Sequence, residues 1–542
     1  MLSHFLALVR SLATLRRIMI RYATALAAAA LLVGMVLLSR DFGATWDERA
    51  LQKFGEELWD YFNGRIARSE IDISFGYMRI YGGVVEFMSA AAQQIIQADL
   101  WVVRHGVNAV FGWVGVVFAF LMASRLFGAR AGWLAALLLI SMPRYVGHSM
   151  NNPKDLPFAV LMLAAGYYIV TVKPQYPYMS WPHALKLALT IALALNVRAM
   201  GLLALGYAGL ALLVAVIASR DWSPAHLGAT AGRFAAIAVL ALVGGSAFWP
   251  WAQESPLTRP IEAFFLTSTF DWGNPSLFMG QSVEGRDVPW YYLPTWVGLT
   301  VPAVVLVGMG CSLARLARNL PARAQLVGVW ALVLVPATAA VVRHLSLYDG
   351  IRHMFFIVPP MAVLAAAGWD FLLASTATRT RIAAALALAA LVAEPILFQV
   401  RNHPNQIVYF TPAIGGPRGA LGRFDMDYWG NCVLEATEWA ASQAVEAGIP
   451  IGVAGSAWEV LVMDANRHRS LYVRQQRHTG WHLNILLLKG SRENVLGLAE
   501  NPGALYRVTT ADGTPLCIVL PGPDYPSLAA QLARRAAVDR RP

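Results

Sequence analysis

The chain has 542 residues, of which 57% are hydrophobic and only 14% are charged, and its formal net charge is +11. An ordinary soluble domain is about one quarter charged. The apolar residues here gather into long runs, and several of these, such as 22–39, 199–218 and 354–373, approach the roughly 20 residues that a helix needs to cross a bilayer. These features argue against a large soluble helical protein and favour a membrane protein with many spans.

The positive charge does not indicate a nucleic-acid partner. A nucleic-acid surface gathers Lys and Arg into one stripe with interleaved aromatic residues. Here the basic residues fall at alternate ends of the apolar runs, as the charges that orient membrane helices do. We therefore expect membrane lipids around the protein and no nucleic acid.

The apolar runs predict an α-helical polytopic membrane protein with about 11 transmembrane helices. Four arginines and no acid precede the first run, which places the N-terminus in the cytoplasm. The inner loops that follow from this orientation are rich in Lys and Arg, and most acids fall outside. Two of the spans are short, so counts from ten to thirteen stay open. The predicted spans are 22–39, 104–124, 131–143, 157–172, 184–196, 199–218, 234–251, 291–312, 325–342, 354–373 and 382–398.

Residues 1–398 would then form a transmembrane domain with a first outer loop at 40–103 and a second long outer loop at 252–290. The remaining segment, 399–542, changes character, because its apolar stretches are short and separated by turn signals. It predicts a small extracytoplasmic α/β domain with an amphipathic helix at 433–447. The expected strands are 449–453, 470–473, 483–488 and 516–520.

The chain has three cysteines, too few for a disulfide framework and without zinc spacing. Cys311 falls in a predicted span, where we expect an inert thiol. Cys432 and Cys517 both fall in the C-terminal segment. A disulfide between them and two free thiols remain open alternatives, because the sequence does not show their separation.

The first outer loop begins with an adjacent pair of acids, Asp47 and Glu48, just beyond the end of a span. A carboxylate near the bilayer surface is costly unless it has a partner or a task. Asp47 is a candidate general base, and Glu48 would raise its pKa or hold Arg49. The alternative is a solvated acidic loop without a catalytic role.

A second dense group of polar residues occupies the segment 143–156, predicted as an outer loop. Asp155 stands at the start of the next helix, where an acid also serves as a cap or as a partner of the helix dipole. The functional hypothesis makes Asp155 a second acid of the same cavity as Asp47, with His148 and Lys154 beside it.

Cations occupy two of the other predicted outer turns. Arg198 lies between two closely spaced spans, and Arg352 and His353 precede another span. Guanidinium groups bind phosphate through paired hydrogen bonds, so these residues, with Lys154, are candidates for binding the phosphate of a lipid. Interfacial anchoring is the alternative.

The loop 252–290 and the start of the following span are aromatic. Aromatic rings stack on sugars, and Trp and Tyr at a bilayer interface also anchor helices; both roles stay open here. The sequence has no phosphate-binding P-loop, no GxSxG motif and no metal site by His or Cys spacing. The candidate substrate-contacting residues of this region are Asp271, Trp272, Trp290, Tyr291 and Tyr292.

Four short motifs in this order resemble a known family: Trp46-Asp47-Glu48, Asn152-Pro-Lys-Asp155, Pro289-Trp-Tyr-Tyr-Leu-Pro294 and the segment from Tyr409 to Gly430. They look like the glycosyltransferases of the C-type membrane fold. The group that they most resemble is the bacterial relatives of dolichyl-phosphate-mannose–protein mannosyltransferases, which include the lipid A aminoarabinose transferases.

The resemblance implies that the chain takes a sugar from a polyprenyl-phosphate carrier and passes it, with inversion, to a glycan, lipid or protein acceptor outside a bacterial inner membrane. The family's catalytic acid corresponds to Asp47, with Glu48 beside it. Arg198 and Arg352 would stabilise the leaving phosphate. Some members use a divalent metal, so Mg²⁺ or Mn²⁺ at Asp47 and Asp155 is left open, and no cofactor is required.

Two other functional classes remain as alternatives. A secondary transporter would show inverted repeats and helices broken near the bilayer midplane, whereas the charged residues here gather at the outer surface. A ligase for lipid-linked glycans, or a non-catalytic membrane scaffold, would share much of the same layout.

Overall fold

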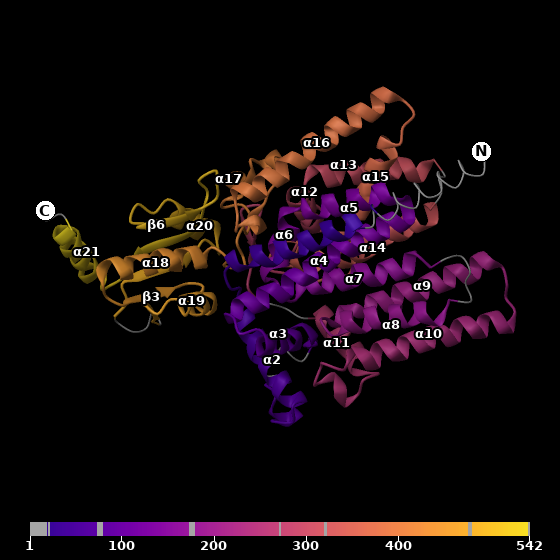
Figure 1. Cartoon of the computed structure of the whole chain (residues 1–542), viewed down its shortest axis with the longest axis horizontal. Coiled ribbons are helices and arrows are strands. Elements are labelled where there is room, and N and C mark those ends of the chain that lie inside the picture. The colour runs from indigo at the N-terminus through magenta and orange to yellow at the C-terminus, as the bar shows by residue number, and fades with distance from the viewer. Residues whose placement is uncertain are drawn as a thin grey trace, which may run out of the picture.

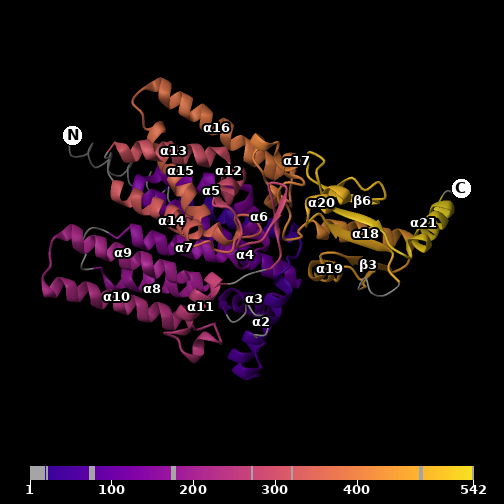
Figure 2. The same cartoon turned by 180° about the vertical axis from the view of Figure 1, so that it is seen from behind.

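The computed structural model describes Met19 and residues 22–72, 80–172, 179–269, 273–318, 322–474 and 480–539. The long helices run roughly side by side, and the C-terminal elements gather beyond one end of them (Figure 1). Seen from behind, α8, α9 and α10 lie along one side of the helical body and α13, α15 and α16 along the other (Figure 2). The architecture is therefore a helical body with a small mixed domain at one end.

Seven helices of the described residues are long and apolar enough to cross a membrane. One bent pair passes the same test together and raises the number to eight, and three shorter apolar helices accompany them. The expectation of a helical multi-pass membrane protein is confirmed. The seven are Tyr22–Asp41, α4 (Leu100–Phe127), Ala199–Ser219 with α9 (Leu202–Ser219), α10 (Pro224–Gly245), α14 (Arg323–Val342), Arg352–Leu373 with α15 (Val358–Leu373), and α16 (Thr378–Arg401).

The bent pair consists of α12 (Tyr292–Thr300) and α13 (Ala303–Ala317), whose axes meet at 113°. Pro302 stands at the break, and proline removes a helix hydrogen bond and clashes with the preceding turn. The three shorter apolar helices are α5 (Ala129–Ile140), α7 (Asp155–Val170) and α8 (Trp181–Leu195).

The segment Arg352–Leu373, which contains α15, is the most buried of the seven long helices, with 83% of its most apolar window buried. Helix α15 is therefore enclosed by the other helices. It packs closely on α13 at two glycines: a Cβ on Gly368 would lie only 1.9 Å from the backbone oxygen of Gly308. Small residues let membrane helices approach to this degree. Both glycines are therefore needed for the contact that fixes α15.

The segment 143–156, predicted as a loop, is mostly helical. Pro143 opens helix α6 (Pro143–Asn151), as proline favours the first turn, and eight of its nine residues are buried. The prediction of a loop was wrong because the polar side chains of this segment bond to neighbouring parts of the protein instead of water: Arg144 Nε donates to Tyr409 O at 3.1 Å and Asn151 Nδ2 to Gly43 O at 2.9 Å.

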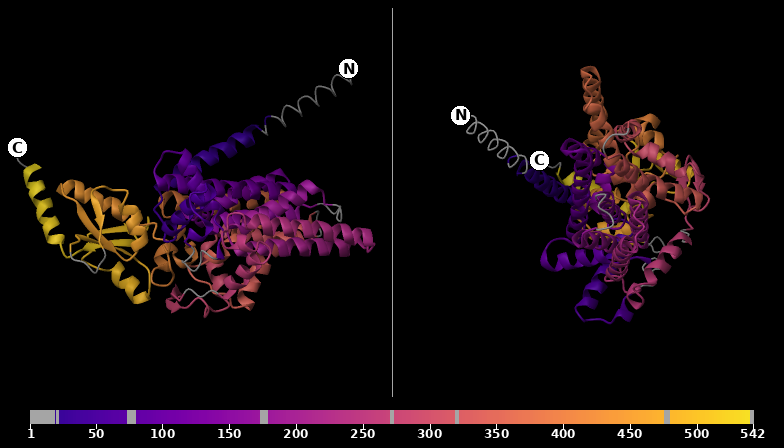
Figure 3. Two further views of the ribbon diagram at one scale, coloured as in Figure 1. Left: turned by 90° about the horizontal axis from the view of Figure 1, so that it is seen from below. Right: turned by 90° about the vertical axis from the view of Figure 1, so that its right-hand side faces the viewer.

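The segments predicted as outer loops also contain regular structure. The first holds α2 and α3, which pack on one another, and α3 also packs on α4; the second holds α11 and a two-stranded hairpin. The left view of Figure 3 shows the C-terminal domain, in yellow, beyond one end of the helical body. The elements of the two segments are α2 (Glu48–Phe62), α3 (Val84–Ile95), α11 (Arg259–Thr269), β1 (Ser276–Phe278) and β2 (Gln281–Val283). Single 3₁₀ turns are η1 (Ser39–Asp41), η2 (Arg68–Glu70), η4 (Ala199–Gly201), η5 (Ala252–Glu254), η6 (Arg352–Ile357), η7 (Gln406–Val408) and η8 (Pro412–Ile414).

The C-terminal domain is built on a five-stranded mixed sheet in the order β4-β3-β5-β7-β6. Strand β3 pairs in parallel with β4 and β5, and β7 pairs antiparallel with β5 and β6. The four predicted strands and the helix ending at Gly448, whose φ is +69°, are confirmed. The strands are β3 (Ile451–Gly455), β4 (Leu471–Val473), β5 (Leu483–Leu487), β6 (Tyr506–Thr509) and β7 (Pro515–Pro521); the helices are α17 (Gly416–Ala420), α18 (Val433–Ala447), α19 (Trp458–Ala465), α20 (Arg492–Ala499) and α21 (Tyr525–Asp539).

A disulfide joins Cys432, at the start of α18, to Cys517 in β7. Of the two alternatives left open by the sequence, the structure therefore has the disulfide and not two free thiols. The bond ties the helix to the sheet across 85 residues of sequence. Cross-linking a loop of that length restricts the unfolded chain and typically stabilises a domain by about 2–5 kcal/mol.

We expect Cys517→Ser to lower the unfolding temperature of the C-terminal domain, because it removes this cross-link. Thermal unfolding of the purified protein, with and without reductant, measures the effect. Cys311→Ser, which alters a thiol outside the disulfide, is the matched control. A Cys517→Ser protein as stable as the control would contradict the prediction.

Candidate active site

A cavity of about 800 Å³ lies where the helical body meets the C-terminal domain. Its walls combine charged side chains with aromatic rings, and its lining comes from eight separate parts of the chain. The residues that line it are Trp46, Asp47, Arg49, Ala50, Lys53, Tyr81, Lys154, Asn274, Pro275, Ser276, Tyr348, Asp349, Arg352, Tyr428, Trp429, Glu459 and Lys489.

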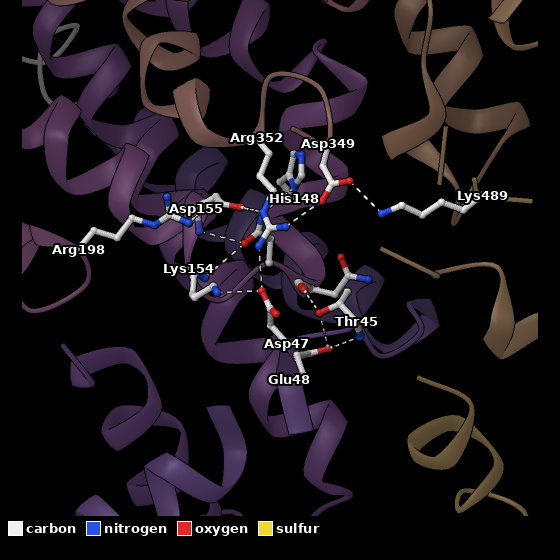
Figure 4. A network of polar contacts seen from close by, with 12 residues as sticks. Thr45, Asp47, Glu48, His148, Lys154, Asp155, Arg198, Asp349, Arg352 and Lys489 are labelled. Carbon is white, nitrogen blue, oxygen red and sulfur yellow. Dashed lines mark hydrogen bonds and ion pairs between the residues drawn. The ribbon is translucent and has the colours of Figure 1, made fainter. Parts of the chain in front are cut away.

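Asp47 precedes the first residue of α2 and lies in the wall of this cavity (Figure 4). Its Oδ2 accepts from Lys154 Nζ at 2.8 Å and from Arg352 Nη2 at 2.9 Å. Burial acts to raise the pKa of Asp47, but these two cations outweigh it and hold the pKa below its ordinary value. Asp47 is therefore an ionised carboxylate with 18% of its side chain exposed.

Asp155 lies deeper, with only 1% of its side chain exposed. It forms an ion pair with Arg198 and a second one with Arg352, whose Nε lies 3.3 Å from Oδ2. Asn152 donates to the same Oδ2 at 3.1 Å and accepts from the Asp155 backbone amide at 2.9 Å. The structure thus joins the two predicted acids through Arg352.

Arg352 is the centre of the network, because its three nitrogens contact three different carboxylates (Figure 4). The third is Asp349, whose Oδ2 lies 3.0 Å from Nη1. The guanidinium also stands over the ring of Trp429, 4.3 Å from its centroid. The opposite oxygen of Asp349 accepts from Lys489 Nζ of the C-terminal domain at 2.9 Å.

Glu48 faces away from this network. Its carboxylate accepts from the backbone amide of Thr45 at 2.8 Å and lies 3.2 Å from His105 Nε2. Burial acts to raise the pKa of Glu48, but His105 outweighs it and the pKa is lowered. Arg49 pairs with Glu459 at 2.9 Å rather than with Glu48. The adjacent acids Asp47 and Glu48 thus have separate partners, the first in the network around Arg352 and the second in His105.

His148 is fully buried and links the network to the C-terminal segment. Asn152 Nδ2 donates to its Nδ1 at 2.8 Å, which requires the proton on Nε2, and that nitrogen lies 3.1 Å from the hydroxyl of Tyr428. Burial lowers the pKa of His148 to about 3, so the ring is neutral. His148 therefore positions other groups and lies outside the cavity wall.

A second cavity, of about 720 Å³, is a mainly apolar groove between α9, α10, α11 and α14. Arg198 and His353 lie in its wall, and His353 packs edge-on against Tyr348. Tyr81 and Tyr348 line both the groove and the cavity that contains Asp47. The apolar part of its lining includes Leu202, Leu203, Leu205, Leu210, Phe234, Phe264, Phe265, Val335 and Met354.

Of the predicted aromatic contacts, Trp290, Tyr291 and Tyr292 are among the described residues, and these three do not line the main cavity. Trp290 and Tyr291 are 70% and 41% exposed. Tyr292 is buried, and its hydroxyl accepts from the Gly350 amide at 3.1 Å, a structural role next to Asp349. Asp271 and Trp272 lie outside the described residues.

The described residues contain no group of three or more His, Cys, Asp or Glu side chains arranged to hold a metal ion. The two acids considered for Mg²⁺ or Mn²⁺, Asp47 and Asp155, are both bound by basic side chains. A divalent cation there would be repelled by Lys154, Arg198 and Arg352. The charge of this donor set does not fit a metal site.

Several residues of the cavity were not predicted from the sequence, among them Tyr81, Tyr348, Asp349 and Lys489. The Asp349-Gly350 turn was the available signal, since an acid in a tight outer turn beside Arg352 has the same cost as Asp47. No local signal marked Lys489, because it lies 140 residues from its partner.

Comparisons with known proteins agree with this picture. Residues 83–251 match the family model of dolichyl-phosphate-mannose-protein mannosyltransferase. A search of curated protein sequences finds no match. The apo crystal structure of ArnT from Cupriavidus metallidurans superposes with a TM-score of 0.50 at 14% identity, over 92% of this chain and 98% of that chain.

Two further structures are similar to a lesser degree. ArnT from the same organism bound to undecaprenyl phosphate gives a TM-score of 0.47 at 14% identity, over 92% and 98% of the two chains. The Archaeoglobus fulgidus oligosaccharyltransferase gives 0.44 at 13% identity, over 84% of this chain and 68% of that one.

The ArnT match establishes the C-type fold for this chain. Over residues 83–251, less than half of the chain, the sequence is also similar to the mannosyltransferase family. The resemblance to C-type membrane glycosyltransferases that the sequence motifs predicted is confirmed.

We expect Asp155→Asn to destabilise the protein by about 3–5 kcal/mol, because it leaves the buried Arg198 without its carboxylate. Thermal or denaturant unfolding in detergent measures the loss. Glu254→Gln, which breaks the partly exposed pair with Arg259, is the control, expected to cost at most about 1 kcal/mol. Equal losses in the two variants would contradict the prediction.

Proposed function

We propose that the chain transfers a sugar from a polyprenyl-phosphate carrier to an acceptor on the extracytoplasmic face, with inversion and with Asp47 as the general base. The observation that carries this proposal is the junction of two cavities. A polar cavity holding Asp47 and an apolar groove holding Arg198 and His353 share the walls formed by Tyr81 and Tyr348. A polyprenyl-phosphate sugar has the same division between apolar tail and polar head.

The apolar groove suits the tail of the donor. Its lining comes from helices long enough to cross the bilayer, so an isoprenoid chain would leave water along its whole length there. At the polar end, Arg198, His353, Arg352 and Lys154 would surround the phosphate. The family described by residues 83–251 is itself named for a dolichyl-phosphate-linked donor.

The polar cavity suits the acceptor. Its volume of about 800 Å³ is within the range of small-molecule sites, and aromatic rings such as Trp46 and Trp429 offer faces for a sugar or another substrate. An acceptor glycan, lipid or protein would enter here. Its nucleophilic oxygen or nitrogen would face Asp47.

The reaction follows from this placement. Both cations bind Oδ2 of Asp47, so Oδ1 is the oxygen placed to take the acceptor's proton. The acceptor atom forms a bond to the anomeric carbon as the bond from that carbon to the phosphate oxygen breaks. The electron pair leaves with the polyprenyl phosphate, and the charge that grows on it is stabilised by Arg198 and Arg352.

The donor phosphate would also make Asp47 a better base. In the free site Lys154 and Arg352 hold the pKa of Asp47 low against the effect of burial, and a base with a low pKa accepts protons poorly. A bound phosphate would draw those cations toward itself. Asp47 would then gain basicity only when the donor is present.

We propose the following topology for this reaction. All eleven apolar segments of residues 1–398 cross a bacterial inner membrane, with the N-terminus in the cytoplasm and residues 399–542 forming the extracytoplasmic domain. The seven long helices, the bent pair and the three shorter helices supply eleven segments. The Cys432–Cys517 disulfide supports an oxidising compartment for the domain.

We expect Asp47→Asn to lower kcat by about 10²–10⁴-fold, because it removes the base and keeps the size of the side chain. The measurement is sugar transfer from a polyprenyl-phosphate sugar by the purified protein. Asp60→Asn, which alters an exposed ion pair between α2 and Arg65 beyond its end, is the control. Full transfer by Asp47→Asn would exclude the proposed mechanism.

We expect Gly206→Trp to raise KM for the donor by roughly tenfold or more with a smaller effect on kcat, because the ring would fill the groove. A Cβ at Gly206 meets no atom within 4 Å, so the fold accepts the side chain. Gly310→Trp is the matched control, since that helix glycine is equally open and does not line the groove. Equal KM values in the two variants would rule out the groove as the donor site.

A further inference from the structure

Lys489 is a cation that the C-terminal domain supplies to the cavity. It follows β5 in a tight turn, where its amide donates to Leu487 O at 2.9 Å and Gly490 has a φ of +119°. Asn494 Nδ2 donates to the Lys489 carbonyl at 3.1 Å. The backbone of the turn is thus fixed, and the side chain reaches the cavity wall.

The partner of Lys489 is held as firmly. Asp349 has a φ of +53°, in the left-handed region that residues other than glycine seldom adopt. Its amide donates to Ser276 Oγ at 3.0 Å, and the next amide, of Gly350, donates to Tyr292 at 3.1 Å. The turn therefore aims the Asp349 carboxylate between two cations.

The two oxygens of Asp349 are divided between those cations. Oδ1 accepts from Lys489 at 2.9 Å and Oδ2 from Arg352 at 3.0 Å. Arg352 in turn donates to Asp47 at 2.9 Å. An unbroken series of ion pairs thus runs from the C-terminal domain to the carboxylate at the other end of the chain.

We propose that Lys489 is a positioning residue: by neutralising Asp349, it leaves Arg352 free to hold Asp47 and, on the proposed function, the donor phosphate. Without Lys489 the whole charge of Asp349 acts on Arg352. The guanidinium would then shift toward Asp349, because it divides its contacts among three carboxylates. Asp47 would lose part of its stabilisation although it does not touch Lys489.

The titratable groups that act on Asp47 and on Asp349 fit the positioning role of Lys489. Lys154, Arg352 and Asp155 act on Asp47, and Lys489, Arg352 and His353 act on Asp349.

Asp349 and Asp425 both act on Lys489. Burial raises the pKa of Asp425 to about 7, whereas Lys489 and Arg352 outweigh burial at Asp349 and hold its pKa low. Lys489 and Arg352 thus keep Asp349 ionised beside Lys489.

A second ion pair makes it possible to distinguish a positioning role of Lys489 from a role in docking the domain. Arg49, in α2, pairs with Glu459 of the C-terminal domain at 2.9 Å, and both residues line the same cavity. Their side chains are 52% and 44% exposed, and neither contacts Arg352 or Asp349 through an ion pair among the described residues. A docking role predicts like effects from both pairs, whereas positioning predicts an effect on Asp47 from Lys489 alone.

The test compares Lys489→Met, Lys489→Arg and Glu459→Gln in the full-length protein, using a polyprenyl-phosphate sugar as donor. We expect Lys489→Met to lower kcat by about tenfold, because Arg352 would move away from the donor phosphate, and to move the acid limb of kcat/KM to higher pH, because a weaker hold by Arg352 raises the pKa of Asp47. Lys489→Arg should restore both, and Glu459→Gln should leave the acid limb in place. An unshifted limb in Lys489→Met, or an equal shift in Glu459→Gln, would overturn the proposal.

A second measurement does not depend on transfer activity. In a double-variant cycle, the changes in unfolding temperature for Lys489→Met and Asp47→Asn should fail to add by about 1 °C or more, since Arg352 couples the two sites. The cycle of Glu459→Gln with Asp47→Asn should be additive. If the Lys489→Met and Asp47→Asn changes are coupled but the wild-type protein transfers no sugar, the proposed function is refuted and the role of Lys489 stands. If both cycles are additive, the role of Lys489 is refuted.

Discussion

The buried ion pairs around Arg352 are the constraint on which the rest of the site depends. Removing charges from water costs several kcal/mol for each ion unless partners compensate it. Three carboxylates, on Asp47, Asp155 and Asp349, meet four cations. Because each carboxylate needs its cations, the start of α2, the start of α7, the turn before α9, the turn before α15 and a loop of the C-terminal domain must meet at one place. The cations are Lys154, Arg198, Arg352 and Lys489.

The same arrangement suits the proposed chemistry. Four cations against three carboxylates leave the network with one unmatched positive charge, which the phosphate of the donor would neutralise. The cations that stabilise the fold in the free protein are then the ones that stabilise the leaving group. Binding of the donor and release of Asp47 as a base become two aspects of one redistribution of charge.

Much of the membrane body and five residues of the network were predictable from sequence. Asp47, Lys154, Asp155, Arg198 and Arg352 stand out because a charge at the outer end of an apolar run is costly. The pattern also predicted the multi-pass helical fold and the mixed sheet. These signals are local, so one sequence is enough to detect them.

The partners of these charges were not predictable. Asp47 and Arg352 are 305 residues apart, and Asp349 and Lys489 are 140 apart, so only the folded chain brings them together. The direction of Glu48 was also hidden, because its partner His105 lies inside a span. Helix α6 was missed for a related reason: its polar residues suggested a loop, whereas they bond in the interior to segments that lie far away in the sequence, such as Gly43, Tyr409 and Tyr428.

The C-terminal domain follows the same logic as the network. It binds the backbone just before Trp46: Gly43 N donates to Asn431 at 3.1 Å and Ala44 N to Asp464 at 3.0 Å. Buried backbone amides need such acceptors, so the segment just before Trp46 takes its shape from residues some 400 positions later. A segment placed by the domain and a network joined to it by Lys489 make the domain one wall of the candidate site. The small domain at the end of the chain is therefore better described as part of this site than as an attachment to a complete membrane body.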